Sequence, residues 1–283
     1  MLRANLYDST FAHDPVGFSV AHQRAKFVEW NKDKHDPNLP TFYSHGEIAH
    51  VRTPKETSYG FVFESRSITP SVYSLLEANL DKFNAVFSHH SELIDQYGSV
   101  KWIPGGGVWI GGSYGKGEIA LHNKSKFCSL VSSTKIMCPL HNYRQRLALE
   151  LAKSQEVEVF GLDKWVPIYE SLHDFKYSII IENHIDKLYF TEKILNCFAT
   201  GTIPIYMGAT DIGSKFNIDG ILTFTNSEEL SSILSDLRNN SYGVSFYEDY
   251  YEAVKDNFKR VQDYITIEDY IYKNYNEILL HTV

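Results

Sequence analysis

The feature that most constrains the fold is an alternation of strand-like and helix-like runs between residues 126 and 208. Short apolar β-type runs and runs with helical spacing follow one another in the order 126–133, 141–154, 157–161, 177–183, 191–200 and 202–208. Strands that alternate with helices form right-handed βαβ units and a parallel sheet. This half of the chain is therefore predicted to be an α/β domain.

The N-terminal half contains a second, shorter alternation. A helical run at 71–82 lies between β-type runs at 59–65 and 83–90, and the first thirty residues suggest only short strands and loops. Residues 103–117 are dense in glycine, so we expect a loop or an inter-domain connection there. A chain of 283 residues exceeds the usual size of one domain. We predict an N-terminal domain, a C-terminal domain and closing helices at 1–124, 125–250 and 251–283.

Composition narrows the classes of partner. The net charge of −8 disfavours binding to nucleic acid or anionic lipid, because a polyanion selects for Lys and Arg. Three scattered cysteines, Cys128, Cys138 and Cys197, suit neither a disulfide framework nor a metal site, and indicate a reducing compartment. No run approaches the roughly 20 apolar residues that span a bilayer, so we expect no integral membrane segment.

The start of the predicted helix at 191–200 is unusual. Two charged side chains, Glu192 and Lys193, follow Thr191 where the chain leaves the carboxyl end of a strand, and such edges bind ligands in open α/β sheets. A helix N-terminus favours an anion, whereas a lysine in the first turn opposes the helix dipole. A phosphate between the Lys193 ammonium and the helix amides would explain the lysine, with Glu192 on a ribose and Tyr189 over the ligand. The alternative is a plain amphipathic helix with Thr191 near its cap and Lys193 in solvent.

The longer string IENHIDKLYFTEKILNCFATGTIPIYMGA, at 181–209, resembles the signature of the α-1,3/1,4-fucosyltransferases, glycosyltransferase family 10. In that signature a Glu-Asn pair, Tyr-x-Thr-Glu-Lys, a helix and Pro-[IV]-x-x-Gly-[AS] follow one another. Flanking segments extend the resemblance over about residues 60 to 225. It implies an α/β fold of GT-B type, with two Rossmann-like domains facing a cleft, and an enzyme that moves L-fucose from GDP-fucose to a glycan hydroxyl with inversion.

The resemblance also implies residue roles. Positions that match the family's donor site are Glu182, Asn183, Tyr189, Thr191, Glu192 and Lys193. Glu192 is implied for the ribose and Lys193 for a phosphate. Counting along the preceding helix selects Arg144 as the family's phosphate-binding arginine, with Arg146 as the fallback; a solvated helix charge is the ordinary alternative for either.

Glu64 is implied as the catalytic base. It ends the apolar run FVFE, where a strand opens into a loop, and it matches the glutamate proposed as base in the family's N-terminal domain. A single glutamate after a strand is otherwise usually solvated. This chain departs from the family at Arg66, where many members have proline.

No cofactor or metal is expected. The chain has no Asp-x-Asp triplet for a divalent cation, so protein cations would neutralise the diphosphate. His89 and His90 have no further ligand at a metal-binding spacing, and Gly105 to Gly107 lack the context of a phosphate-binding loop.

The expected partners are GDP-fucose and an oligosaccharide or glycan acceptor. Residues 1–60 carry no readable acceptor specificity. The missing membrane anchor suggests a bacterial or viral protein in the cytoplasm. Two alternatives stay open: a GT-B enzyme that uses another nucleotide-sugar, and a non-catalytic module that binds GDP-sugar or glycan.

Overall fold

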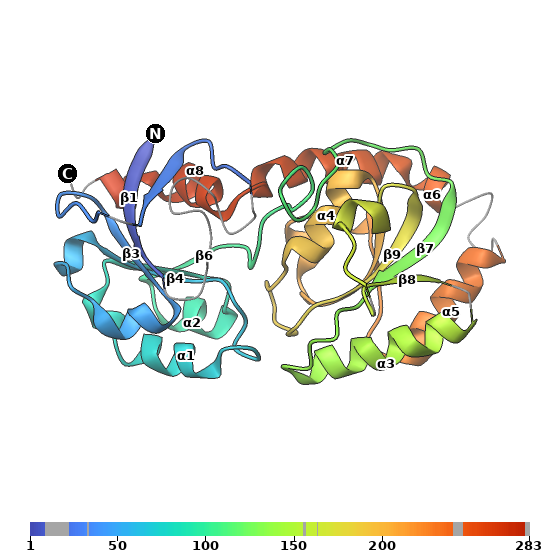
Figure 1. Ribbon diagram of the computed structural model, residues 1–283, viewed down its shortest axis with the longest axis horizontal. Coiled ribbons are helices and arrows are strands. Elements are labelled where there is room, and N and C mark those ends of the chain that lie inside the picture. The colour runs from blue at the N-terminus through green and yellow to red at the C-terminus, as the bar shows by residue number, and fades with distance from the viewer. Residues whose placement is uncertain (9–22, 33, 155–156, 163, 240–245, 281–283) are drawn as a thin grey trace. The chain divides into compact units, whose positions relative to one another are not determined.

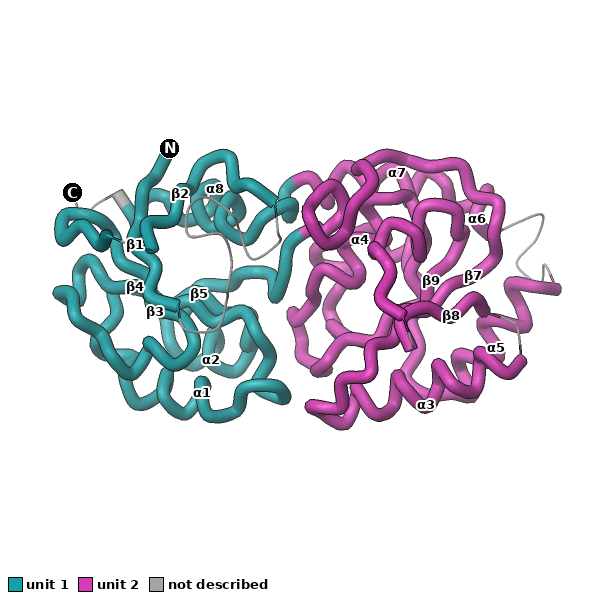
Figure 2. The backbone as a smooth tube through the Cα atoms, in the orientation of Figure 1, with its two compact units in different colours: residues 1–107, 263–283 teal, residues 108–262 magenta. Residues whose placement is uncertain are grey.

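The chain forms two compact units (Figure 2). The computed structural model describes residues 1–8, 23–32, 34–154, 157–162, 164–239 and 246–280. Unit 1 comprises residues 1–107 and 263–283, and unit 2 comprises residues 108–262. These boundaries differ from those expected at 124/125 and 250/251.

Two local causes account for the different boundaries. Ile267 and Ile271 near the chain's end lie in the apolar core of unit 1, so the last helix belongs there. Residues 108–124 belong to unit 2 because the Trp109 and Ala120 amides donate to residues of a unit 2 helix, to Asn196 Oδ1 at 2.8 Å and to the Ala199 carbonyl at 3.1 Å.

Unit 1 contains a parallel sheet of six strands among its described residues. The strands, in spatial order, are β2 (Val28–Asn31), β1 (Leu2–Tyr7), β3 (Thr41–Ser44), β4 (Ser58–Val62), β5 (Ala85–Ser88) and β6 (Val100–Trp102). Helices α1 (Pro70–Glu77) and α2 (Ser91–Gln96) cover one face, and α8 (Ile267–Leu280) covers the other (Figure 1). Alternate residues of β4 follow this division, since Tyr59 and Phe61 face α8 and Val62 faces α1.

The predicted elements of unit 1 are found with shifted ends. The run at 59–65 stops as a strand at Val62, and the run at 83–90 becomes a strand only at Ala85. The first thirty residues contain β1 and part of β2, whereas the prediction for 9–22 lies outside the described residues.

Unit 2 contains a parallel sheet of five strands within the described part of the chain. The strands, in spatial order, are β11 (Leu222–Thr223), β10 (Ile203–Met207), β9 (Phe175–Ile181), β7 (Lys126–Val131) and β8 (Glu158–Phe160). Helices α3 (Pro139–Ser154) and α5 (Ser227–Arg238) lie on one side, and α4 (Glu192–Thr200) and α7 (Tyr251–Val261) on the other (Figure 1). The predicted strand-helix alternation and parallel sheet are confirmed.

Short elements connect this framework. They are α6 (Phe246–Asp249) and the 3-10 helices η1 (His45–His50), η2 (Lys55–Thr57), η3 (Leu80–Lys82), η4 (Ile168–Ser171), η5 (Ile212–Ser214), η6 (Ile218–Gly220) and η7 (Gln262–Tyr264). Among the described residues, no helix is both long and apolar enough to cross a membrane.

The centre of unit 2 explains where a ligand site can form. Strand β9 is buried on both faces, as expected for a central strand of a parallel sheet, so its carboxyl end lies in the middle of one sheet edge. Helix α4 begins near that edge with Thr191 as N-cap, and it ends at Gly201, whose left-handed φ of 71° suits glycine. The strand β9 and helix α4 therefore bring Glu182 and Lys193 together.

Candidate functional site

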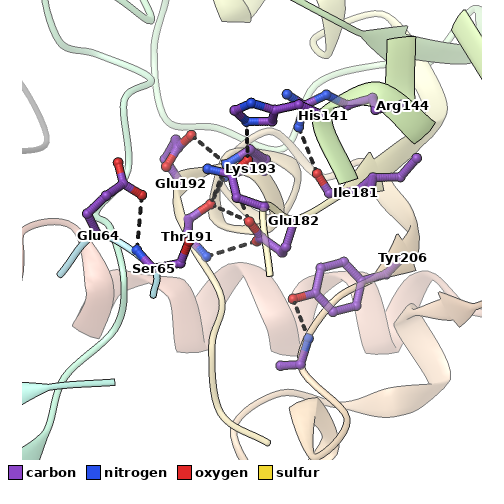
Figure 3. A network of polar contacts seen from close by, with 12 residues as sticks. Glu64, Ser65, His141, Arg144, Ile181, Glu182, Thr191, Glu192, Lys193 and Tyr206 are labelled. Atoms are coloured by element: carbon purple, nitrogen blue, oxygen red, sulfur yellow. Dashed lines mark hydrogen bonds and ion pairs between the residues drawn. The ribbon is translucent and has the colours of Figure 1, made fainter. Parts of the chain in front are cut away.

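Glu182 joins the end of β9 to the start of α4. Its side chain is fully buried, and its amide donates to the Met207 carbonyl of β10 at 2.9 Å. Its carboxylate accepts two hydrogen bonds from Thr191, from the amide at 2.9 Å and from Oγ1 at 2.7 Å (Figure 3). Burial raises the pKa of Glu182, while Lys193 and the Thr191 donors oppose the rise. Glu182 is thus a fixed part of the site.

Lys193 is held by three oxygens. Its Nζ lies 3.3 Å from Glu182 Oε2, 3.0 Å from Thr191 Oγ1 and 3.2 Å from Glu192 Oε1 (Figure 3). Two carboxylates therefore offset the unfavourable position of this cation in the first turn of α4. The alternative of a solvated lysine does not describe this side chain, which is 21% exposed.

Gly208 allows Glu182 to take this position. A Cβ built on Gly208 would lie 2.3 Å from the Tyr206 hydroxyl and 2.6 Å from Glu182 Cγ. The Tyr206 hydroxyl itself accepts from the Ala209 amide at 3.0 Å. The glycine of the Pro-x-x-x-Gly part of the signature is therefore required by close packing at this sheet edge.

Arg144 brings a second cation to the end of β9, from helix α3. Its side chain is buried, and Nη1 donates to the Ile181 carbonyl at 2.9 Å (Figure 3). Its Nε is buried and has no hydrogen-bond partner among the described residues. Arg144 also forms no ion pair with any described residue. Burial lowers the pKa of Arg144, whereas Glu182 and Glu192 raise it. A buried guanidinium with unused donors is expected to bind an anion.

His141 and Cys138 were not predicted from the sequence. His141 Nε2 lies 2.8 Å from Asn183 Oδ1, and the Cys138 thiol donates to the Asn183 carbonyl at 3.3 Å. His141 precedes Arg144 on α3 by three residues, the spacing of neighbours on one helix face, and Cys138 directly precedes the helix. That spacing was a readable signal once Arg144 had been selected.

Two predicted residues lie differently from our expectation. Tyr189 is fully buried, 6.2 Å between ring centroids from His184, so it has no exposed ring to close over a ligand. Arg146 is exposed and lines a surface hollow of about 230 Å³ beside Tyr143 and Ser227. Since α3 turns Arg144 inward and Arg146 outward, the structure brings only Arg144 to Glu182.

Glu64 belongs to unit 1, where it follows β4. It is half-buried, and its carboxylate accepts from the Ser65 amide at 3.1 Å. Its carbonyl accepts from the Tyr73 hydroxyl at 2.8 Å, which anchors the backbone. Arg66 pairs with Glu77 at 3.0 Å on α1. Glu64 thus sits on a backbone fixed by α1 at the carboxyl edge of its sheet.

The described residues contain no group of three or more His, Cys, Asp or Glu side chains that could hold a metal ion. The three cysteines are buried and free. The Gly-dense segment at 103–117 contains the boundary between the two units, as expected of an inter-domain connection. Its part in unit 2 is anchored there, since Asn196 Oδ1 accepts from the Trp109 and Ile110 amides at 2.8 and 3.3 Å.

Comparison with solved structures supports the same fold. An α1,3-fucosyltransferase crystallised with GDP matches with a TM-score of 0.54 and 15% identity, over 94% of this chain and 91% of that one. The α1,3-fucosyltransferase with GDP-fucose matches with a TM-score of 0.54 and 15% identity, over 99% and 90%. Sucrose-phosphate synthase from Thermosynechococcus elongatus matches with a TM-score of 0.57 and 9% identity, over 99% and 89%. At these identities the likeness shows the GT-B fold alone, as predicted.

Sequence comparison identifies the family. No curated protein matches the sequence significantly. The model of the C-terminal part of glycosyltransferase family 10 (fucosyltransferase) matches residues 121–274, more than half of the chain. That range contains β9, α4, β10 and every residue of the cluster around Glu182. The chain therefore belongs to glycosyltransferase family 10, the fucosyltransferases.

Proposed function

We propose that this chain transfers L-fucose from GDP-fucose to a hydroxyl group of a glycan, with inversion at the anomeric carbon. The observation that carries the proposal is the pair of cations Arg144 and Lys193 at the carboxyl end of β9, beside the N-terminus of α4. Family membership gives the reaction class, and two structural neighbours were crystallised with GDP and with GDP-fucose.

The leaving group explains the two cations. As the bond between the anomeric carbon and the phosphate oxygen breaks, negative charge grows on the diphosphate, and positioned cations and amides stabilise it. The guanidinium of Arg144 can bind phosphate oxygens through two donors at once, and Lys193 adds a point charge. The α4 amides complement them, because the positive end of the helix dipole favours an anion.

The acceptor needs a base. Its hydroxyl oxygen attacks the anomeric carbon from the side opposite the diphosphate, and the hydroxyl proton must leave during the attack. Glu64 is our choice for this base, since it is a half-buried carboxylate directly after β4, on a backbone that the Tyr73 hydroxyl anchors through the Glu64 carbonyl. We expect Glu192 to bind the ribose and no metal to be required.

A donor screen tests the proposal. GDP-fucose, GDP-mannose, UDP-galactose and UDP-glucose are each supplied with a panel of glycan acceptors, and nucleotide release and glycan mass are measured. We expect saturable release and a mass gain of one deoxyhexose with GDP-fucose alone. A preference for a UDP-sugar would refute the assignment of the donor, and tight GDP binding without turnover on any acceptor would indicate a binding module.

A further inference from the structure

His141 is a buried side chain at the site for which the proposed mechanism has no use. It lies in the first turn of α3, and both ring nitrogens have partners. The Met137 amide lies 3.2 Å from Nδ1, and Asn183 Oδ1 lies 2.8 Å from Nε2. A histidine with two defined partners has a defined tautomer.

The Met137 amide decides the tautomer of His141. An amide N–H can only donate, so Nδ1 must carry a lone pair and the ring proton must be on Nε2. The Nε2–H group then donates to Asn183 and fixes the oxygen of its amide toward α3. Burial and the nearby Arg144 cation lower the pKa of His141, which keeps the ring neutral.

The consequence for Asn183 is a fixed orientation. Its Oδ1 accepts from His141 and its backbone carbonyl accepts from the Cys138 thiol, so both oxygens of this residue have donors at the start of α3 or directly before it. The Arg144 guanidinium likewise donates a hydrogen bond to the Ile181 carbonyl. Two side chains of α3 and the cysteine that directly precedes it thus donate to the acceptors of residues 181 and 183. The amide NH₂ group of Asn183, which is half-buried, is left as a donor.

We propose that His141 is a positioning residue for nucleotide binding, which holds the Asn183 amide with its NH₂ group turned toward an oxygen of the bound nucleotide. The inference rests on the proposed function, since it takes a nucleoside diphosphate as the ligand. His141 does not touch the nucleotide in this arrangement. Without it, the Oδ1 of Asn183 would lose its donor from α3, and the amide would no longer be held in this orientation.

Two substitutions separate the roles of the two ring nitrogens. The side-chain amide of glutamine reaches the position of Nε2 and can still donate to Asn183, whereas that of asparagine reaches only the position of Nδ1. We expect His141→Gln to keep the dissociation constant for GDP within about threefold. His141→Asn and Asn183→Ala should each raise it about tenfold, the effect of one lost hydrogen bond to a charged group.

A double-mutant cycle gives the decisive measurement. If His141 acts through Asn183, adding His141→Asn to Asn183→Ala should raise the GDP dissociation constant by less than about twofold further. Fully additive effects, or equal losses in His141→Gln and His141→Asn, would overturn the inference. Calorimetry with GDP gives the constants, and thermal unfolding identifies variants that fail to fold.

The wild-type protein provides a second test that needs no variant. Nitrogen-15 NMR of the histidine rings should show His141 protonated on Nε2 alone at pH 7.5, and a proton on Nδ1 would overturn the inference. If the wild type binds UDP instead of GDP, the proposed donor is wrong and the same cycle is measured with UDP. If it binds neither nucleotide, both proposals fail.

Discussion

Replacing Arg144 by methionine should separate binding from stability. The variant loses the charge and the bond from Nη1 to the Ile181 carbonyl, but it keeps much of the buried volume. A carbonyl left without a donor costs about 1–3 kcal/mol. Removal of a buried cation that contacts no carboxylate directly relieves a desolvation penalty of several kcal/mol, and the lost attraction to Glu182 and Glu192 offsets part of this relief. The two effects oppose each other, so the free energy of unfolding should fall by less than about 1 kcal/mol, or rise.

The effect of this substitution on GDP should be larger. A charge-assisted hydrogen bond to phosphate contributes roughly 1.5–3 kcal/mol, so Arg144→Met should raise the GDP dissociation constant about 10- to 150-fold. Guanosine, which has no phosphate, should bind nearly as before. Calorimetry with both ligands measures these constants, and urea unfolding of the free protein measures stability.

A matched control lies two residues away on the same helix. Arg146→Met removes an exposed arginine that lines a surface hollow, and it should change neither GDP binding nor stability appreciably. The reasoning is refuted if Arg144→Met binds GDP as tightly as the wild type. It is also refuted if Arg146→Met loses as much affinity, or if guanosine and GDP lose equally, since the defect would then be in the fold.

Four further predictions concern other parts of the protein. Glu64→Gln should lower transfer about 100- to 10,000-fold, the range for a general base, while GDP affinity measured by calorimetry stays within a few-fold; normal turnover would move the base elsewhere. Gly208→Ala should cost about 1–3 kcal/mol in urea unfolding and weaken GDP binding, because its Cβ would displace Glu182; an unchanged variant would refute the packing argument. The pKa of His141 in the folded protein lies below its ordinary value of 6.5, so the unfolded state takes up a proton first and the free energy of unfolding should fall as the pH drops below that value. In His141→Asn the free energy of unfolding should depend less on pH, and a slope identical to that of the wild type would contradict this. Transfer in EDTA should persist, and a complete loss restored by Mn²⁺ would contradict a clamp made of protein cations.

The parts of the fold with strong local periodicity in the sequence were predicted best. The elements of unit 2 between residues 126 and 208 were predicted one by one, because β9 is a continuous apolar run and α4 has a capping threonine and a terminal glycine. Unit 1 was predicted less well. Its strands β2 and β3 have only four residues each, too few to establish a period, and their pairing is long-range. The return of α8 to unit 1 also depends on tertiary packing, which no local pattern encodes.

The candidate site was predictable only in part. The signature marks Glu182, Thr191 and Lys193, but the bonds between them depend on the close approach of β9, β10 and α4. His141 was missed because its contact with Asn183 joins residues 42 positions apart in the chain, and the spacing from Arg144 alone does not show that α3 packs against the end of β9. The burial of the Tyr189 ring could not be predicted from the sequence either, since burial of an aromatic side chain depends on tertiary packing.

The balance of charge in the cluster indicates how a diphosphate can enter it. Glu182 and Glu192 carry two negative charges against the two positive charges of Lys193 and Arg144, so the site has no basic excess that composition could have revealed. A phosphate must displace an oxygen from Lys193. Glu182 cannot move, because it is fully buried and bonded to Thr191 through both carboxylate oxygens. Among the described residues, the Glu192 carboxylate is bonded to Lys193 alone, and its side chain is 18% exposed. We therefore expect Glu192 to turn from the lysine to the ribose as the nucleotide binds, which leaves Lys193 free to bind the diphosphate beside Arg144.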